Sequence, residues 1–223
     1  MPLETKPVLC YVTDRRALGP QPPAGTGAAA AAAAALVEAA ARAASLGVDW
    51  IQVREKDLHG GPLLKLVSDV QKRAGPARIL VNDRLDVALA AGAGGVHLGG
   101  EGLPVAAVRA SLGKRDAGSF LVGKSCHSLG EARAAQTAGA DYIFFGPVFA
   151  TPSKLAYGAP QGIDRLAGVC RALTIPVVAI GGISPDNAAE CLAAGAQGVA
   201  AIRCFQQSDG LAARIARLRA VCG

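Results

Sequence analysis

The chain has 223 residues, of which 51% are hydrophobic but only 4% are aromatic, and its net charge is +6. That length is enough for one large core and is common for a single α/β barrel. The lysines and arginines are scattered, and no aromatic residues are interleaved with a basic run. This pattern argues against a nucleic-acid protein and favours small anionic substrates.

Cysteine usage and hydropathy indicate the compartment. The six cysteines lie far apart in mostly apolar segments, without a CxxC pair, which is typical of small core residues in a reducing cytosol. We find no signal peptide, and the apolar run at residues 28–35 is short of a membrane span. We therefore expect a cytoplasmic protein that binds neither membrane nor nucleic acid.

Predicted strands and helices alternate along the chain after a first strand and a Pro/Gly-rich connection at residues 14–27. The predicted elements in chain order are strand 7–13, helix 27–46, strand 50–54, helix 62–74, strand 78–82, helix 85–91, strand 95–98, helix 104–112, strand 120–125, helix 128–138, strand 142–145, helix 163–172, strand 176–180, helix 185–194, strand 198–203 and helix 209–221. The alanine-rich first helix has low complexity, but the glycine and the strand that follow favour a docked helix.

A short glycine motif recurs with the period of two strand–helix units. The copies are LGV at 46–48 and AGA at 91–93, 138–140 and 194–196, and each ends a predicted helix before an even-numbered strand. Glycine there suits a left-handed helix cap. We predict an α/β fold, a single (β/α)8 TIM barrel with one domain over residues 1–223. The alternative is a doubly wound open sheet, but no GxGxxG follows the first strand.

In such a barrel the active site lies at the carboxyl ends of the strands. Strand alternation places Gln52, Arg54 and Lys56 on one face, where an amide and two cations are unusual for a barrel interior. The alternative is a charged strand end in water. Asn82 and Asp83 end the third strand, and their oxygens suit Mg²⁺. Asp83 would serve equally as a cap for the following helix.

Two later loops favour phosphate. The stretch at 141–162 carries Thr151, Ser153 and Lys154 after a strand, and two hydroxyls beside an ammonium can hold a phosphate. A solvated surface loop is the alternative. Gly181 and Gly182 follow the seventh strand, where backbone N–H groups can approach a phosphate. A tight turn would explain the same pair.

The fifth strand ends in a set of polar residues whose sequence adjacency is ambiguous. Cys126 and His127 are neighbours, but a nucleophile–base pair is made in space, so adjacency is no evidence for one. Ser125 precedes them at the strand end. Ser128 is equally well placed to cap the next helix.

Six motifs, each at a predicted strand end, together resemble the thiamine-phosphate synthase family and the related thiazole tautomerase family. They are QVREK (52–56), VND (81–83), GVHLG (95–99), SCHS (125–128), GPVFATPSK (146–154) and AIGGI (179–183). The resemblance runs from the second strand to the eighth. It implies a transferase of thiamine biosynthesis, which couples 4-amino-2-methyl-5-(diphosphomethyl)pyrimidine to thiazole phosphate. The reaction releases pyrophosphate and gives thiamine phosphate.

The resemblance also implies roles for the matching residues. The pyrimidine diphosphate would be held by Gln52, Arg54, Lys56, Asn82, Ser125 and Lys154. The thiazole phosphate would contact Thr151, Ser153, Gly182, Ile202 and Arg203, the last three in part through the backbone. Asp83 would ligate the Mg²⁺ cofactor, and the catalytic set would be Lys56, Lys154, Ser125 and His127. Glu101 is the candidate second metal ligand in place of the family's aspartate; the alternative is that strand alternation points it outward. Because the thiazole nitrogen is the nucleophile, positioning and charge stabilisation suffice without a covalent residue.

The chain departs from the family at three places. After the fourth strand, synthases carry Gln-Glu-Asp with a second metal-binding aspartate, whereas this chain has Gly100, Glu101 and Gly102. Arg203 stands where the family has serine, and it would either strengthen phosphate binding or block the site. The hydroxyl pair of the long loop is Thr-Pro-Ser instead of Thr-x-Thr.

These departures keep two alternatives open. A thiazole tautomerase isomerises thiazole carboxylate phosphate without Mg²⁺, and the resemblance implies that His127 would be its acid–base group. A binder of thiazole or thiamine phosphate would have kept the phosphate loops and lost catalysis. Retention of Lys56, Asn82, Asp83 and Lys154 favours the synthase. Barrels of this kind often pair, which makes a homodimer a candidate assembly, but the sequence itself does not give the oligomeric state.

Overall fold

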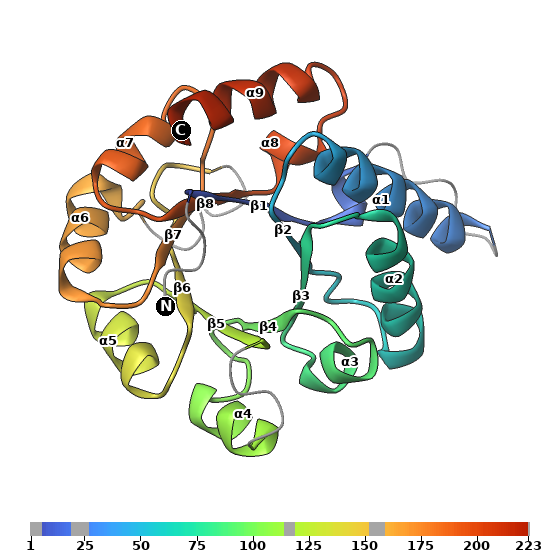
Figure 1. The fold of residues 1–223 in the computed structure, drawn as a ribbon, viewed down its shortest axis with the longest axis horizontal. Helices are drawn as coiled ribbons and strands as arrows, with labels where there is room; N and C mark the ends of the chain where they lie inside the picture. The colour runs from blue at the N-terminus through green and yellow to red at the C-terminus, as the bar shows by residue number, and fades with distance from the viewer. Residues whose placement is uncertain (1–5, 19–26, 114–118, 152–158, 223) are drawn as a thin grey trace.

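The computed structural model describes residues 6–18, 27–113, 119–151 and 159–222, and it contains a closed barrel of eight parallel strands. Figure 1 shows the strands as an inner ring with the helices outside it. The strands are β1 (Val8–Val12), β2 (Trp50–Val53), β3 (Arg78–Asn82), β4 (Gly95–Leu98), β5 (Leu121–Cys126), β6 (Tyr142–Phe145), β7 (Val177–Ile180) and β8 (Gly198–Ala201). Because β8 pairs with β1, the (β/α)8 prediction is confirmed and the open sheet is excluded.

The helices follow the strands in turn. They are η1 (Arg15–Ala17), α1 (Ala28–Ser45), α2 (Gly60–Arg73), α3 (Leu85–Ala90), α4 (Val105–Leu112), α5 (Leu129–Thr137), α6 (Gly162–Ala172), α7 (Ala188–Ala193), α8 (Arg203–Gln206) and α9 (Leu211–Cys222). Parallel strands require such crossovers, and helices then cover the outer face of the sheet.

Strand alternation divides the core into two layers. Between strands and helices the packing is mostly by alanine, valine, leucine and isoleucine. Inside the barrel, small residues such as Val8 and Ala200 alternate with large ones, and Trp50 meets Tyr142 edge-on with ring centroids 4.9 Å apart. Trp50, Tyr142 and Phe144 thus help to fill the centre of the barrel, as a closed eight-strand barrel requires, while Tyr11, Phe145 and Phe205 pack in the outer layer.

The predicted glycine caps are present in all four copies. In each, the residue after the glycine donates its N–H to a carbonyl five positions earlier, as in Ala93 to Ala88 at 2.9 Å and Ala196 to Cys191 at 3.1 Å. Gly92 and its three equivalents have positive φ angles. This bonding is that of a Schellman cap, which ends the helix and turns the chain into the next strand.

Most element ends lie within two residues of the prediction, and three differences alter the elements themselves. The eighth strand was expected to run to residue 203, but β8 ends at Ala201 and the chain turns into α8. The connection after β1 contains η1. The seventh helix begins at Ala188 instead of 185, because Asn187 folds back and its side chain accepts from the N–H of Ser184 at 2.9 Å.

Within the described residues, α1 is long and apolar enough by composition to cross a membrane. In the structure its Leu36, Ala40 and Ala43 are fully buried. The helix lies against α2 on the outside of the barrel (Figure 1). These contacts are those of a core helix of the barrel layer.

Candidate active site

A chain of hydrogen bonds joins the ends of β2 and β3 inside the barrel. Gln52 is only 2% exposed, and its Nε2 donates to Asn82 Oδ1 at 2.8 Å. Asn82 Nδ2 in turn donates to Asp83 Oδ2 at 2.7 Å. The structure therefore brings together three polar residues that the sequence placed at neighbouring strand ends.

Asp83 is held in an uncommon backbone conformation, with φ of 59°. Its Oδ1 accepts from the N–H of Gly99 at 2.6 Å, and α3 begins after Arg84 without a side-chain cap. The helix-cap alternative for Asp83 is therefore wrong. A left-handed non-glycine residue that directs a carboxylate to the barrel mouth is a feature of functional sites.

The loop after β4 lies directly against this carboxylate. A Cβ at Gly102 would collide with Asp83 Oδ1, and a Cβ at Gly99 would lie 3.2 Å from Oδ2. Lys124 Nζ donates to the carbonyl of Gly99 at 2.5 Å from the other side. Glu101 is exposed, and the loop atoms that approach Asp83 are those of the Gly99 and Gly102 backbone.

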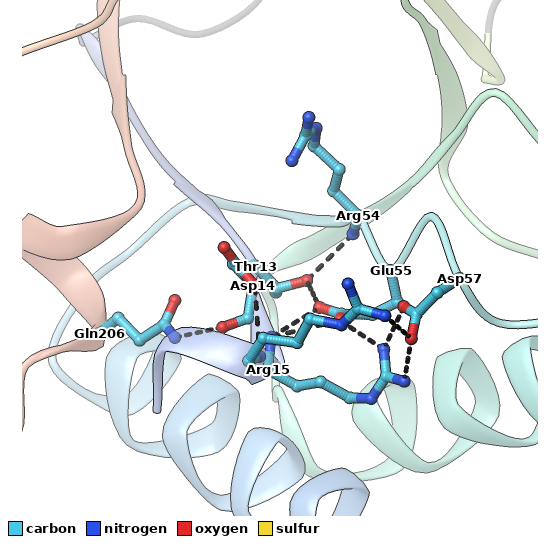
Figure 2. Close-up of polar contacts among 8 residues, drawn as sticks. Thr13, Asp14, Arg15, Arg54, Glu55, Asp57 and Gln206 are labelled. Carbon is cyan, nitrogen blue, oxygen red and sulfur yellow. Dashed lines mark hydrogen bonds and ion pairs between the residues drawn. The ribbon is translucent and has the colours of Figure 1, made fainter. Parts of the chain in front are cut away.

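Glu55 organises the loop after β2, as Figure 2 shows. Its buried carboxylate accepts from the Thr13 hydroxyl at 2.7 Å and from the Arg15 guanidinium at 3.0 Å. Arg15 also makes two bonds to Asp57, at 2.7 and 2.6 Å. Thr13 Oγ1 accepts from the backbone N–H of Arg54 at 2.9 Å, and the Arg54 side chain points away from the cluster.

The charges of this cluster reinforce one another. Hydrogen bonding to Arg15 holds the pKa of Asp57 well below its usual range, and the Asp57 carboxylate raises the pKa of Arg15. Next to it is an open pocket of about 290 Å³. Its lining residues are Asp14, Arg16, Arg54, Glu55, Lys56 and Asp57. Arg54 is half-buried and Lys56 exposed, so the two predicted cations share this pocket, while Gln52 lies inside the barrel.

Ser125 ends a second buried hydrogen-bonded chain. Its Oγ lies 2.9 Å from His97 Nε2, and His97 Nδ1 lies 3.1 Å from the Tyr142 hydroxyl. The His97 ring is 1% exposed and lies 4.1 Å from the Phe144 ring between centroids. Burial, followed by the charges of Lys124 and Arg54, lowers the pKa of His97 to about 3. The imidazole is therefore neutral at physiological pH.

The neighbouring SCHS residues separate into distinct roles. Ser128 caps α5 by accepting from the N–H of Glu131 at 3.2 Å, as expected. His127 Nδ1 lies 2.5 Å from the carbonyl of Gly146, which can only accept, so Nδ1 carries the proton. Cys126 is fully buried, and burial raises the pKa of its thiol to about 12. A protonated, buried thiol is a core residue rather than a nucleophile.

The glycine pair after β7 allows the long loop after β6 to approach. Gly181 and Gly182 have φ of 96° and 70°. A Cβ at Gly182 would lie 2.7 Å from Phe149 Cβ and 2.9 Å from the Ala150 carbonyl. The tight turn is thus real, and it brings the backbone that leads into Thr151 against Gly182. These are two of the positions predicted for one phosphate.

Of the remaining predicted residues, the structure describes some and not others. Ser153 and Lys154 lie outside the described residues. Arg203 is exposed at the start of α8, directly after the half-buried Ile202. Thr151 is half-buried.

Sequence reasoning assigned no role to several residues that shape the mouth of the barrel. They are Thr13, Glu55, His97, Lys124 and Tyr142. Alternation along β4 was an available signal for His97, because it sits at an inward position among apolar neighbours. The partners of Glu55 and Tyr142 lie tens of residues away, and the strand patterns contain no signal for them.

Comparison with known proteins gives a consistent result. The family model described as "Thiamine monophosphate synthase" matches residues 26–205. A putative thiamine-phosphate synthase of Geobacter sulfurreducens is 54% identical over 159 residues, which are 70% of this chain and 72% of that protein. The thiamine-phosphate synthase of Chlorobium phaeobacteroides is 38% identical over 92% of this chain and 91% of its own length. The solved thiamine phosphate pyrophosphorylase from Pyrococcus furiosus superposes with a TM-score of 0.78 at 33% identity, covering 96% of this chain and 94% of that one.

Proposed function

The chain belongs to the thiamine monophosphate synthase family, and from that premise we propose which residues carry out the synthase reaction at the mouth of its barrel. The reaction couples the pyrimidine methyl diphosphate to thiazole phosphate, releases pyrophosphate and gives thiamine phosphate. The observation that carries the assignment is the Gln52–Asn82–Asp83 chain, which holds a fixed carboxylate at the carboxyl ends of the strands, the end at which β2 leads into Arg54 and Lys56.

The diphosphate is the group that these residues must stabilise, because negative charge grows on it as the C–O bond breaks. Arg54 and Lys56 supply positive charge from the pocket. By the family resemblance, Lys154 adds a third cation. Ser125 donates a hydrogen bond. Gln52 and Asn82 hold the pyrimidine side in position. Fixed cations and donors at the developing charge lower the barrier without a covalent intermediate.

The residues present fit a magnesium ion of the kind that binds through one or two carboxylates and the substrate phosphates. Each Asp83 oxygen accepts one protein hydrogen bond and keeps a lone pair, while no group of three or more acidic, His or Cys ligands occurs among the described residues. Asp83 would hold the ion, with Glu101 as the second candidate ligand. When bound, Mg²⁺ supplies charge neutralisation for the departing diphosphate.

The thiazole phosphate is assigned to the opposite side of the mouth. Thr151 and Ser153 provide hydroxyl donors from the loop after β6, and the backbone at Gly182 and at Ile202–Arg203 provides N–H groups. Loops after strands seven and eight are a frequent phosphate site in this fold. The exposed guanidinium of Arg203 adds a cation where the phosphate would lie.

The proposal also covers the cellular compartment, the domain organisation and the partners. All six cysteines are free, which supports a cytoplasmic enzyme. In this proposal the substrates are small anions, residues 1–223 form a single domain that acts without nucleic acid or membrane, and a homodimer is the candidate assembly.

The test is pyrophosphate release from the two substrates, with Mg²⁺ and then with EDTA. We expect Mg²⁺-dependent release with thiamine phosphate appearing. Asp83→Ala should lower the rate about a hundredfold, since it removes the carboxylate fixed at the mouth. Asp69→Ala, at a half-buried carboxylate of α2 that pairs with Lys65 on the outside of the barrel, is the control and should leave the rate unchanged.

The other outcomes are equally informative. Turnover of Asp83→Ala at the normal rate would contradict its assignment. Absence of release by folded protein, with isomerisation of thiazole carboxylate phosphate, would identify the tautomerase and make His127 the next residue to mutate. Tight phosphate binding with turnover of neither substrate set would identify a non-catalytic binder.

A further inference from the structure

The buried chain Tyr142–His97–Ser125 contains a choice between two proton arrangements. A neutral imidazole has one donor and one acceptor nitrogen, so His97 can donate either to Ser125 or to Tyr142. In the first arrangement Tyr142 donates to Nδ1, and Nε2–H donates to Ser125 Oγ. In the second, Nδ1–H donates to the phenol oxygen, and the serine hydroxyl donates to Nε2.

Only the first arrangement satisfies every buried donor. The Tyr142 hydroxyl is fully buried, and His97 is its hydrogen-bond partner among the described residues. In the second arrangement the phenol proton would point into the core without an acceptor there, which native proteins avoid. Burial also raises the pKa of Tyr142 well above its usual value, so the phenol keeps the proton that it donates.

A glycine on the neighbouring strand leaves the space that the Tyr142 phenol occupies. Gly123 on β5 lies beside the Tyr142 side chain, and a Cβ there would collide with both the ring and the hydroxyl. The strand register pairs Gly123 with His97 on one side and with Tyr142 on the other. The hydroxyl is therefore held against the imidazole by three adjacent strands rather than by a flexible loop.

We propose that Tyr142 and His97 form a hydrogen-bond relay that fixes the Ser125 hydroxyl as a donor toward an anionic group at the barrel mouth. The relay occupies the acceptor side of Ser125 with His97 Nε2–H, so the serine proton is directed away from His97. Tyr142 and His97 are positioning residues that act through Ser125. This inference deepens the proposed function and rests on it for the identity of the anion, a diphosphate.

The proton position can be measured directly without substrate. The protonated and bare nitrogens of a neutral imidazole have well separated ¹⁵N chemical shifts, and single His→Gln variants assign the three histidines. We expect His97 to be protonated on Nε2 in the wild type. Tyr142→Phe removes the donor to Nδ1, so it should move the Nδ1 shift toward that of a nitrogen that accepts no hydrogen bond. Protonation of wild-type His97 on Nδ1 would overturn the relay.

A double-mutant cycle tests the consequence for anion binding, with inorganic pyrophosphate as the probe and calorimetry as the measurement. Ser125→Ala should weaken pyrophosphate binding about tenfold, the effect of one hydrogen bond to a charged group. Tyr142→Phe should weaken it several-fold, and the double variant should be no weaker than Ser125→Ala alone. Additive losses would show that Tyr142 acts only through the general packing of the barrel, and would refute the relay.

Tyr11→Phe is the matched control. The Tyr11 hydroxyl is also fully buried, but it has no hydrogen-bond partner among the described residues. The change should leave both the His97 shifts and pyrophosphate binding as in the wild type. The relay and the proposed function fail separately: Nε2 protonation without synthase turnover contradicts only the function, and turnover with Nδ1 protonation contradicts only the relay.

Discussion

At the scale of single residues, Asp83 explains why glycine is suited to position 102. The carboxylate is fixed by Asn82 and by the Gly99 N–H, and the backbone at Gly102 lies against its Oδ1. A side chain at 102 would have to displace either the loop or the carboxylate. The glycine that departs from the family pattern is therefore matched to the packing of this chain.

This close approach makes Gly102→Ala informative. The added methyl group should push the Asp83 carboxylate or the Gly99 loop aside, and a misplacement of this kind can cost up to a hundredfold in rate. We expect kcat/KM for pyrophosphate release to fall about tenfold. Gly100→Ala is the control, because its Cβ would meet no atom within 4 Å and should leave the rate unchanged. Equal rates for the two variants would show that the loop yields without moving Asp83.

Residue-scale prediction from the sequence succeeded where strand ends alone decide the position. Gln52, Asn82 and Asp83 were expected at adjacent strand ends, and they form one hydrogen-bonded chain. The contact of His97 with Tyr142 was not foreseen. It depends on the slot at Gly123 and on the register of three strands, which the local pattern does not contain.

At the scale of elements, the strong periodic segments were predicted well and the short ones were missed. The bounds of β3, β4 and β6 agree with the prediction. The missed elements, η1 and α8, have three and four residues and are too short for a hydrophobic period to appear. Gln206 of α8 is buried and donates to the Asp14 carbonyl, so a distant contact holds this short helix.

The glycine caps allow a matched test at this scale. Gly92 has φ of 62° with open space around its Cβ position, so Gly92→Ala adds backbone strain without a clash. Left-handed conformation costs an L-residue about 1–2 kcal/mol, so the melting temperature should fall by about 2–8 °C. Gly168→Ala, inside α6 with open space, should raise the melting temperature instead, because alanine is the better helix former. Thermal unfolding of both variants measures the contrast, and an unchanged or higher midpoint for Gly92→Ala would contradict it.

At the scale of the whole molecule, each end of the barrel is tied by charged side chains from distant segments. At the amino ends of the strands, Arg219 of α9 donates to the Pro7 carbonyl at 3.1 Å and pairs with Asp49. At the carboxyl ends, Arg15 joins the loop after β1 to the loop after β2 through Asp57. Such contacts close the chain on itself and follow from the complete fold, so no segment of sequence predicts them.

The cluster at the carboxyl ends predicts how stability depends on pH. The pKa of Asp57 is lowered in the fold by hydrogen bonding to Arg15, from an ordinary value of 3.8. Its contribution is therefore fully present above about pH 4 and is lost as the pH falls below that value. Because the Asp57 side chain is 34% exposed, we expect only about 1 kcal/mol, or roughly 2–4 °C in melting temperature.

Asp57→Asn tests this dependence through melting temperatures at pH 7 and at pH values from 4 downward. The variant should melt lower than the wild type at pH 7, and the two curves should converge in acid, where the wild-type carboxylate is protonated and its pair with Arg15 is lost. Asp209→Asn, at an exposed position between α8 and α9, is the charge-matched control and should run parallel to the wild type. A constant gap between Asp57→Asn and the wild type down to acid pH would mean that Asp57 stabilises the mouth through shape rather than charge. In that case the bonds of Arg15 to Glu55, rather than those to Asp57, would have to hold the loop that carries Arg54.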